Sequence, residues 1–344
     1  MRAENDLPKP FLAYRIAVQT ELERTIATCP AGLRGMLRYH MGWQDEQGHS
    51  CNRESGKFIR SGLCLLSCEA VGGNPSQAMP AAAAVELIHN FSLIHDDIQD
   101  ASDERHHRPT VWKVWGQPQA INAGDAMFTL AYLALLRLKE KGIDSRKVSN
   151  CARMLTLACL ELCEGQYLDI EYEGRLDVAV SDYLDMAAKK TAALLAAAAY
   201  LGGYLGSGDN NLADLFHSFG KELGIAFQIC DDILGIWGTP QITGKSASDI
   251  AKKKKTLPVV YALQSADGEA KRKLEKLYSQ DCMRDEHAEQ VVGILDQLRA
   301  REYAQNLAEQ CYRRALAQLR ATGIDEQRQA SLREAARFLV ERKF

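Results

Sequence analysis

The chain has 344 residues, a formal net charge of −3 and a sequence pI near 6.3. A chain of this length buries a substantial core, as one large domain or two smaller ones. Its charge excludes a general electrostatic attraction to nucleic acid or to anionic membranes, so we expect neither as a partner. The first ten residues, MRAENDLPKP, are charged and contain proline, so they predict no signal sequence.

The cysteines and the apolar segments indicate the expected compartment. Ten cysteines are scattered along the chain, and the pairs Cys64/Cys68 and Cys159/Cys163 stand four residues apart without metal-site companions. Buried, reduced thiols are the expected state of such residues in a cytosolic protein. The longest apolar stretch, residues 191–205, is too short to cross a membrane. We therefore expect a cytoplasmic protein with no membrane span.

Helical periodicity dominates the sequence, and no alternating strand pattern stands out. In chain order we predict helices at residues 10–28, 57–72, 76–101, 119–139, 146–173, 180–205, 209–237, 257–265, 285–321 and 325–342. Glycine- and proline-containing breaks separate them, and none is a long low-complexity linker. The sequence therefore marks no domain boundary.

Several central segments, such as residues 191–205, are apolar on nearly all sides, which is typical of helices inside a large bundle. Residues 285–321 instead carry one apolar stripe on a charged background, which predicts an outer helix. The apolar residues of 119–138 fit either the core or a dimer surface. We predict one all-α domain over residues 1–344, a large helical bundle around a central active-site cavity.

Three aspartates lie in the apolar helical segment LIHDDIQD, residues 93–100. Asp96 and Asp100 share one helix face, and Asp97 lies about 100° round. Carboxylates crowded on one face repel each other unless a cation neutralises them, and oxygen ligands with room for water and phosphate suit Mg²⁺. A solvated acidic helix end is the alternative interpretation.

A second acidic pair, Asp231 and Asp232, lies in an equally apolar segment, GIAFQICDDILGIWG. Two such clusters in one chain weaken the interpretation as solvated helix ends. They indicate a diphosphate bridged by metal ions and held between two helices.

A site for diphosphate should add Lys and Arg to the metal ions. The sequence offers cations near both clusters: Lys57 and Arg60 at an early helix start, Arg105, His106 and Arg108 after the first cluster, Lys190 beside Thr191 in an apolar helix, and Lys245 with Lys252–Lys255 after the second cluster. A lysine run is usually only a solvated surface. Its position beside the second cluster favours a lid that closes over the diphosphate.

Seven segments together resemble the trans-isoprenyl diphosphate synthase family over nearly the whole chain. They are GKFIR (56–60), VELIHNFSLIHDDIQD (85–100), RHHRPT (105–110), EGQYLD (164–169), KKTAAL (189–194), GIAFQICDD (224–232) and GKSASDIAKKKKTLP (244–258). One aspartate cluster alone would be weak, but seven motifs in order are specific. The resemblance implies the isoprenoid synthase type of helical bundle and a homodimer.

The resemblance also implies the reaction. An allylic diphosphate loses its diphosphate, the double bond of isopentenyl diphosphate attacks the resulting cation, and the released diphosphate accepts the proton that is then lost. The residues implied to bind the allylic diphosphate, directly or through metal ions, are Asp96, Asp97, Asp100, Arg105, Lys190, Asp231, Asp232 and Lys245. Thr191 and Gln228 are implied to line the site of the allylic cation with oxygen dipoles. Three Mg²⁺ ions are implied: Asp96 and Asp100 would bridge two, and Asp231, aided by Asp232 and Asp249, would hold the third.

Further residues are implied to bind isopentenyl diphosphate and to set product length. Lys57, Arg60, His89 and His106 form the first group, and Lys254, in the lysine run of the predicted lid, is a further substrate-binding residue. Phe91, Ser92 and Ile88 form the second, because a bulky side chain below the first cluster would stop the growing prenyl tail. The pattern, small at Ser92 and aromatic only at Phe91, resembles short-chain enzymes that make geranylgeranyl diphosphate; farnesyl diphosphate is the alternative product.

Three positions depart from the family pattern. His106 stands where a second Arg usually contacts isopentenyl diphosphate, and an imidazole lacks the forked, permanent charge of Arg. We expect His107 and Arg108 to compensate for that loss. Gly235 replaces the last Asp of the second cluster, and Phe58 replaces an Arg that often follows the Gly-Lys pair.

Two other functions remain open. Loss of the second substrate site at His106 would make the protein a terpene cyclase acting on one prenyl diphosphate, although Lys57, Arg60 and His89 argue against it. A non-catalytic regulatory subunit of a partner synthase would be expected to lose metal ligands, and the five cluster aspartates are all present.

Overall fold

The structure is a computed structural model that describes residues 7–51, 56–238, 248–280 and 282–341. Apart from one pair of two-residue strands, its named elements are helices, which confirms the all-α prediction. The chain groups into two compact units, each assembled from three stretches of sequence. The prediction of a single domain stays a prediction.

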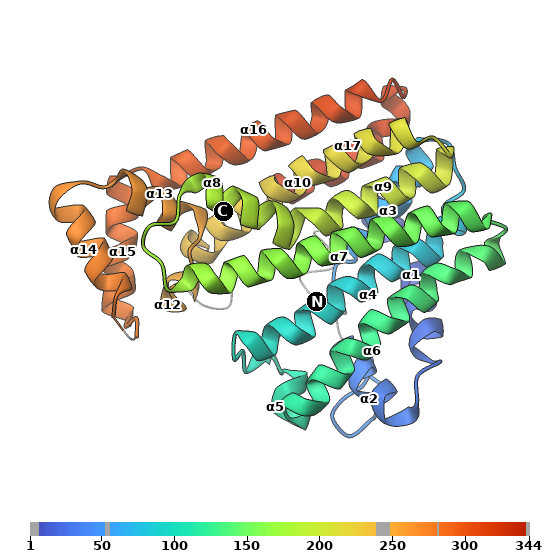
Figure 1. Cartoon of the computed structure of the whole chain (residues 1–344), viewed down its shortest axis with the longest axis horizontal. Coiled ribbons are helices and arrows are strands. Elements are labelled where there is room, and N and C mark those ends of the chain that lie inside the picture. The colour runs from blue at the N-terminus through green and yellow to red at the C-terminus, as the bar shows by residue number, and fades with distance from the viewer. Residues whose placement is uncertain (1–6, 52–55, 239–247, 281, 342–344) are drawn as a thin grey trace. The chain divides into compact units, whose positions relative to one another are not determined.

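Unit 1 comprises Met1–Thr156, Ala197–Asp214 and Ile324–Ala335. Its elements are α1 (Lys9–Ile26), α2 (Ala31–His40), α3 (Ile59–Ala70), α4 (Pro75–Gln99), β1 (Glu104–Arg105), β2 (Arg108–Pro109), α5 (Val111–Trp115), α6 (Gln117–Leu136), the 3-10 helix η2 (Arg137–Lys141), the first part of α7 (Ser145–Glu173), most of α9 (Ala193–Ser207), the start of α10 (Asn210–Trp237) and most of α17 (Glu326–Val340). Within this unit α4 packs most extensively against α6 and then α3, and Figure 1 shows α4 running alongside α6.

Helix α4 is the element that carries the first aspartate cluster. It begins after Asn74, whose side-chain oxygen accepts the backbone N–H of Ser76 at 3.0 Å, so an otherwise orphaned donor is satisfied. Four consecutive alanines, residues 81–84, are fully buried, and their small size lets neighbouring helices approach closely. Near the other end His95 lies against Gly124 of α6, where an added Cβ would come within 2.2 Å of the imidazole. His95 is therefore a packed histidine of the α4–α6 contact.

A short antiparallel hairpin follows α4, with Arg105 opposite Arg108. Its two turn residues, His106 and His107, have φ values of 53° and 58°. Tight two-residue hairpins require positive φ at both central positions, which usually selects Asn or Gly. Because two histidines occupy the turn, the sequence pattern did not predict the hairpin.

Unit 2 comprises Leu157–Ala196, Leu215–Gly323 and Ala336–Phe344. Its elements are the rest of α7, α8 (Val180–Ala187), the π-helical turn η3 (Ala188–Ala192), parts of α9 (Ala193–Ser207), α10 (Asn210–Trp237) and α17 (Glu326–Val340), and α12 (Ser248–Ala251), α13 (Leu257–Ser265), α14 (Gly268–Tyr278), α15 (Asp285–Gln297) and α16 (Ala300–Ala321). Buried side chains from α10 and from α12 to α16 form one core in this unit, including Ile250, Val259 and Val291.

The predicted helix over 285–321 is wrong as a single element. It is two helices, α15 and α16, separated at Leu298 and Arg299, and Arg299 adopts a left-handed conformation with φ 53°. No glycine or proline marks this break. In the part of the chain that the structure describes, no helix is long and apolar enough to cross a membrane.

Candidate active site

Asp96 and Asp100 lie one helical turn apart at the end of α4. The backbone N–H of Asp100 donates to the carbonyl of Asp96 at 2.8 Å, which places both residues on the same side of the helix, as predicted. Both are half-buried. We call Asp96, Asp97 and Asp100 the first aspartate site.

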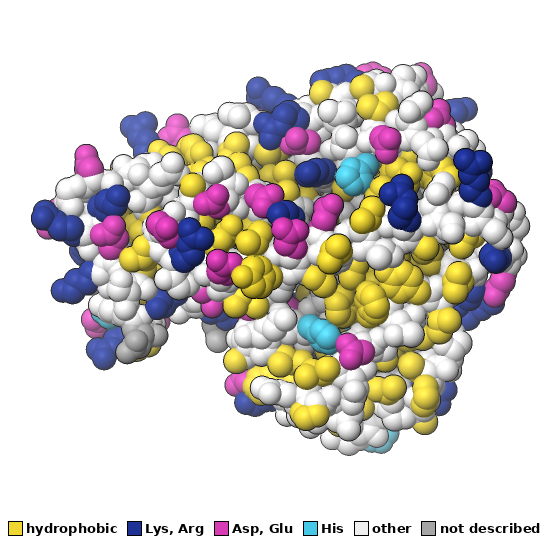
Figure 2. All heavy atoms as spheres, viewed as in Figure 1, with side chains coloured by type: hydrophobic (Ala, Val, Ile, Leu, Met, Phe, Trp, Pro, Cys, Tyr) yellow, Lys and Arg dark blue, Asp and Glu magenta, His cyan; other side chains and the backbone are white. Residues whose placement is uncertain are grey.

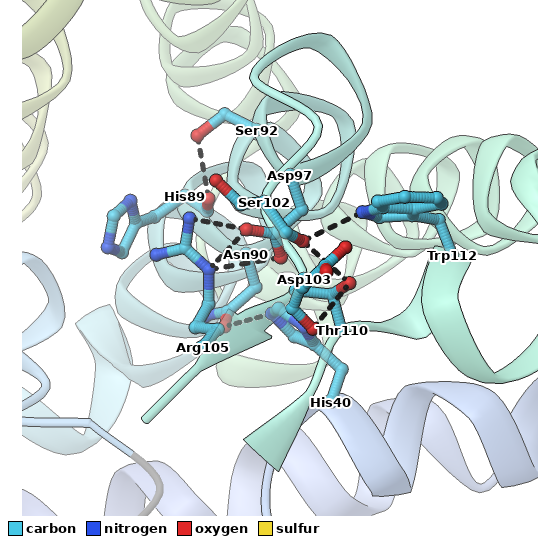
Figure 3. Close-up of polar contacts among 10 residues, drawn as sticks. All are labelled: His40, His89, Asn90, Ser92, Asp97, Ser102, Asp103, Arg105, Thr110 and Trp112. Carbon is cyan, nitrogen blue, oxygen red and sulfur yellow. Dashed lines mark hydrogen bonds and ion pairs between the residues drawn. The ribbon is translucent and has the colours of Figure 1, made fainter. Parts of the chain in front are cut away.

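Asp97 is bound within the protein. Its side chain is 3% exposed, and it accepts hydrogen bonds from Nε of Arg105 at 3.0 Å to Oδ1 and 3.1 Å to Oδ2 (Figure 3). Burial raises the pKa of the Asp97 carboxyl, and the Arg105 guanidinium opposes that rise. Asp97 therefore fixes the arginine of the hairpin beside Asp96 and Asp100.

Arg108 holds the hairpin to the end of α2. Its guanidinium donates to the backbone carbonyl of Tyr39 at 2.9 Å and lies 4.1 Å from the centre of the Tyr39 ring. The Tyr39 hydroxyl donates in turn to the carbonyl of Pro109 at 2.8 Å. Arg108 is thus anchored to α2 and His107 is an exposed turn residue; the expectation that they compensate for His106 stays a prediction.

A chain of hydrogen bonds beneath the hairpin connects α4 to α2. The Asn90 amide donates to the carbonyl of Glu86 at 2.8 Å, so its oxygen faces Nε2 of His40, 3.1 Å away. An amide oxygen only accepts, and the imidazole nitrogen facing it must therefore carry the proton. Burial and the charges of Arg105, His106 and Arg108 lower the pKa of His40 to about 3.

His89 lies in the same positive surroundings. Burial, Arg60 and Arg105 lower the pKa of its imidazole well below the usual value, and Figure 3 shows its ring on the same side as the Arg105 guanidinium. Arg60 follows the left-handed Phe58 at the start of α3, near the buried Glu86, whose carboxylate accepts Ser61 Oγ at 2.9 Å. Lys57 is exposed. This concentration of cations suits an anion.

The residues expected to set product length occupy different surroundings in α4. Ile88 is fully buried. The Ser92 hydroxyl donates to the carbonyl of His89 at 2.7 Å, so it turns back onto its own helix. Phe91 meets Phe128 of α6 edge to face, with ring centres 5.4 Å apart.

In unit 2, a π-helical turn carries Lys190 and Thr191. Such turns are rare and occur frequently at functional sites. Two glycines make room for it: a Cβ on Gly165 of α7 would come within 2.1 Å of the Lys190 backbone nitrogen, and one on Gly224 of α10 would come within 2.5 Å of the Ala192 Cα. The motifs EGQYLD, KKTAAL and GIAFQICDD therefore meet around this turn.

The side chains of those motifs are paired. Lys190 forms an ion pair with Asp169 of α7. The Thr191 hydroxyl donates to Oε1 of Gln228 at 2.5 Å, and Nε2 of Gln228 donates to Oδ1 of Asp232 at 2.9 Å. Burial raises the pKa of Asp232 to about 7, and hydrogen bonds from Tyr183 and the backbone N–H of Leu257 oppose that rise.

We call Asp231, Asp232 and Asp249 the second aspartate site. Asp231 and Asp249 are half-buried and form its more open part. Burial raises the pKa of Asp249; Lys254 and Lys252 oppose the rise, and the charges of Asp231 and Asp169 add to it. These carboxylates and lysines therefore lie within electrostatic reach of one another. The Asp249 carboxylate packs directly against Gly235, because a Cβ on Gly235 would come within 1.9 Å of Oδ2 of Asp249.

The run Lys252–Lys255 divides into two pairs. Lys253 donates to the carbonyl of Gln280, and the buried Lys255 donates to that of Glu173, the last residue of α7, at 2.8 Å. These two lysines are bound to backbone carbonyls within the protein. Of the run, only Lys252 and Lys254 are therefore still assigned to the predicted lid. Lys245 lies outside the described residues.

The carboxylates fit Mg²⁺. Among the residues that the structure describes, no group of three or more His, Cys, Asp or Glu side chains forms a metal cage. Mg²⁺ is usually held by one or two carboxylates together with waters and substrate phosphates. The half-buried pair Asp96 and Asp100 supplies that donor set, and Asp231 supplies a carboxylate of the same kind in unit 2.

Several residues of these sites were missed in the sequence. His40 lies outside every quoted motif, and Asn90, Gly165 and Asp169 lie in quoted motifs without an assigned role. Tyr183 donates to Asp232 at 2.6 Å, yet it precedes the motif KKTAAL by several residues. Only motif membership signalled Asn90, Asp169 and Gly165.

Residues 43–295 match the family model described as polyprenyl synthetase. The chain is 38% identical over 343 residues to "(2E,6E)-farnesyl diphosphate synthase" of Mycobacterium tuberculosis, covering 98% of this chain and 93% of that protein. A polyprenyl synthetase structure from Streptomyces coelicolor A3(2) superposes with a TM-score of 0.88 at 37% identity, covering 95% of this chain and 97% of that one. A geranylgeranyl pyrophosphate synthase from Corynebacterium glutamicum, complexed with isoprenyl diphosphate and magnesium, gives a TM-score of 0.81 at 28% identity over 98% of this chain and 100% of that one.

Proposed function

Since the chain belongs to the polyprenyl synthetase family, we propose that it is a short-chain prenyltransferase that condenses isopentenyl diphosphate with allylic diphosphates. The observation that carries this proposal is the arrangement of the first aspartate site. Asp96 and Asp100 lie one turn apart and half-buried, while Asp97 holds Arg105 beside them.

Ionisation of the allylic diphosphate is the demanding step, because negative charge develops on the leaving group. Groups fixed in place before the reaction stabilise such charge best where water is excluded. Arg105 is held by Asp97, and Lys190 is held by Asp169. Both cations are therefore preorganised, and we assign them to the departing diphosphate.

The metal ion adds to this stabilisation. Mg²⁺, when bound, neutralises charge on the diphosphate and so makes it a better leaving group. Asp96 and Asp100 are the proposed ligands in unit 1, and Asp231, with Asp249 nearby, is the proposed ligand in unit 2. The family resemblance implies this assignment and the number of three ions, and the relative from Corynebacterium glutamicum, which is complexed with magnesium, supports magnesium as the metal.

We assign the diphosphate of isopentenyl diphosphate to Lys57, Arg60, His89 and His106. The charges of Arg60, His106 and Arg105 all act on His89, and this concentration of cations favours an anion there. An imidazole at position 106 lacks the forked, permanently charged donors of Arg, so the expected consequence is a KM for isopentenyl diphosphate higher than with Arg at this position rather than a lower turnover. We propose that Lys254, whose charge acts on Asp249, binds substrate at the second aspartate site.

Geranylgeranyl diphosphate is the product that the chain-length residues favour. Ser92 is small and its hydroxyl turns back onto α4, while the aromatic residue beside it, Phe91, packs against Phe128 of α6. The relatives include a synthase named for farnesyl diphosphate and one named for geranylgeranyl diphosphate. Farnesyl diphosphate therefore stays the alternative product.

We also propose a homodimer formed through α6. Leu130, Ala134 and Leu135 of this helix are buried in unit 1, so they belong to the core. Ile121, Leu133 and Leu136 are exposed by 46%, 49% and 52%, and hydrophobic side chains gather on the face that α6 presents in Figure 2. Large exposed apolar residues on one helix are typical of an interaction surface.

The test compares Mg²⁺-dependent incorporation of labelled isopentenyl diphosphate by the wild type with that of Asp96→Ala and Asp231→Ala. Each substitution removes a proposed metal ligand, and each is expected to reduce turnover by at least a factor of about 10³. Asp267→Ala is the matched control, because this exposed aspartate lies in α14's N-terminal cap position without a side-chain hydrogen bond. Activity that persists in both ligand variants would refute the proposal.

A further inference from the structure

We infer that Asp232 is a positioning residue: it fixes the amide of Gln228, and through it the hydroxyl of Thr191, toward the developing cation. The inference rests on the proposed prenyl transfer. It replaces the expectation that Asp232 assists Asp231 in binding metal.

Asp232 gathers three donors from three different elements of unit 2. Its Oδ2 accepts the Tyr183 hydroxyl of α8 at 2.6 Å and the first backbone N–H of α13, that of Leu257, at 2.8 Å. Its Oδ1 accepts Nε2 of Gln228 at 2.9 Å. A carboxylate oxygen accepts about two hydrogen bonds, so Oδ2 is fully used, and the residue is only 5% exposed. Asp231, its neighbour, is half-buried and so is the better placed of the two for a metal ion.

The contact with Asp232 decides which way the Gln228 amide faces. A carboxylate accepts only, so the group that faces it must be the NH₂ of the amide. The carbonyl oxygen of Gln228 then faces the other way, where it accepts the Thr191 hydroxyl proton. One buried charge thereby sets the orientation of two neutral dipoles.

The orientation of Thr191 has a chemical consequence. Because the hydroxyl proton of Thr191 is directed at Gln228, the lone pairs of Oγ1 are available to an electron-poor group, here the allylic cation. Hydrogen bonds in a chain polarise one another, and the negative end of this chain is the Asp232 carboxylate. The chain therefore increases the negative charge on Oγ1 of Thr191, which stabilises a nearby allylic cation without any group taking up a proton.

The π-helical turn supports the same assignment. It places Thr191 between Gly165 and Gly224, whose missing side chains let the helices approach the turn closely. Gly224, Gln228 and Asp232 follow one another at four-residue intervals on one face of α10. The backbone and the hydrogen-bond chain therefore share one rigid frame.

The test exchanges the charge between two positions. Asp232→Asn keeps the shape but presents an amide to Gln228, so the Gln228 amide must flip and the Thr191 hydroxyl loses its acceptor. We expect kcat to fall by a factor of about 10 to 100, with little change in the KM for either substrate. The double variant Asp232→Asn, Gln228→Glu restores an acceptor for Thr191, and we expect it to recover most of the lost kcat.

A second readout is independent of turnover. Calorimetric binding of inorganic diphosphate with Mg²⁺ should be unchanged by Asp232→Asn and weakened by Asp231→Asn, and thermal melting shows that each variant is folded. Two results would overturn the inference: a double variant as slow as Asp232→Asn, or loss of Mg²⁺–diphosphate binding in Asp232→Asn equal to that in Asp231→Asn. A wild type that binds Mg²⁺–diphosphate yet transfers no prenyl group would instead refute the proposed function.

Discussion

Gly235 is explained by the residue that fills its space. The carboxylate of Asp249 lies where a side chain at position 235 would begin, 1.9 Å from an added Cβ. Gly235 therefore leaves room for the Asp249 carboxylate at the second aspartate site. An aspartate at position 235, as in the family pattern, would compete for that space.

Gly235→Ala is therefore predicted to lower turnover several-fold while changing the free energy of unfolding by less than about 1 kcal/mol, because the atom displaced is the end of a side chain. Gly235→Asp should be worse than Gly235→Ala, although it restores the family residue. Steady-state kinetics and urea unfolding measure both effects. Gly293→Ala is the control, since it lies in α15 with nothing within 4 Å of an added Cβ; equal kinetics for Gly235→Ala and Gly293→Ala would contradict the account.

His40 predicts a pH dependence of stability. Burial and neighbouring cations lower the pKa of the folded imidazole to about 3 from its usual 6.5. Below about pH 6.5 the imidazole of His40 binds a proton in the unfolded chain but not in the folded protein. The free energy of unfolding therefore falls as the pH falls toward 3. His40→Gln keeps a donor for Asn90 and removes this titration.

Urea unfolding of wild type and His40→Gln at pH 7.5 and 5.5 measures this effect. The wild type should lose about 1.4 kcal/mol more than the variant between those pH values, the linkage expected of one histidine whose folded pKa lies far below the window. His89, with its lowered pKa, and Glu86, Asp97 and Asp232, with raised pKa values, titrate in both proteins and cancel in the difference. Equal pH dependence of the two proteins would mean that His40 is protonated in the fold.

At the scale of elements, the π-helical turn depends on the absence of side chains at two positions. A Cβ on Gly165 would meet backbone at the Lys190 nitrogen, which cannot move aside as a side chain can. Gly165→Ala should therefore destabilise the protein by about 1 to 3 kcal/mol and lower kcat, because Thr191 moves with the turn. Gly32→Ala, in α2 with open space around it, should do neither. Thermal melting and kinetics of the two variants give the comparison, and unchanged values for Gly165→Ala would count against a rigid turn.

The sequence predicted most helices within a few residues, because apolar periodicity and glycine breaks mark them clearly. It missed α2, which is short and contains two glycines, and it also missed α5, α12 and α14. It joined α15 to α16 because an arginine makes the left-handed break. The aspartate clusters were found from their apolar surroundings. Which aspartate binds a partner, as Asp97 binds Arg105 and Asp232 binds Gln228, depends on contacts between elements that the sequence pattern does not contain.

At the scale of the whole molecule, the exposed apolar residues of α6 predict a homodimer. Replacing Leu133 and Leu136 together with Glu would place charges in the proposed interface, and unpaired buried charge is strongly unfavourable. Analytical ultracentrifugation should then report a monomer for the double variant and a dimer for the wild type. Ile16→Glu on α1, 81% exposed, is the control and should stay dimeric; a double variant that still sediments as a dimer would place the interface elsewhere.

The central claim is prenyl transfer itself. The most direct test incubates the purified protein with Mg²⁺, labelled isopentenyl diphosphate and each allylic primer in turn, and identifies the labelled product. The account predicts label in geranylgeranyl diphosphate, which would also show that His106 suffices where an Arg is usual. Hydrocarbon or alcohol released from a longer prenyl diphosphate, without incorporation of label, would contradict the claim and indicate a cyclase. No reaction with any primer would contradict it too, and would indicate a subunit that depends on a partner synthase.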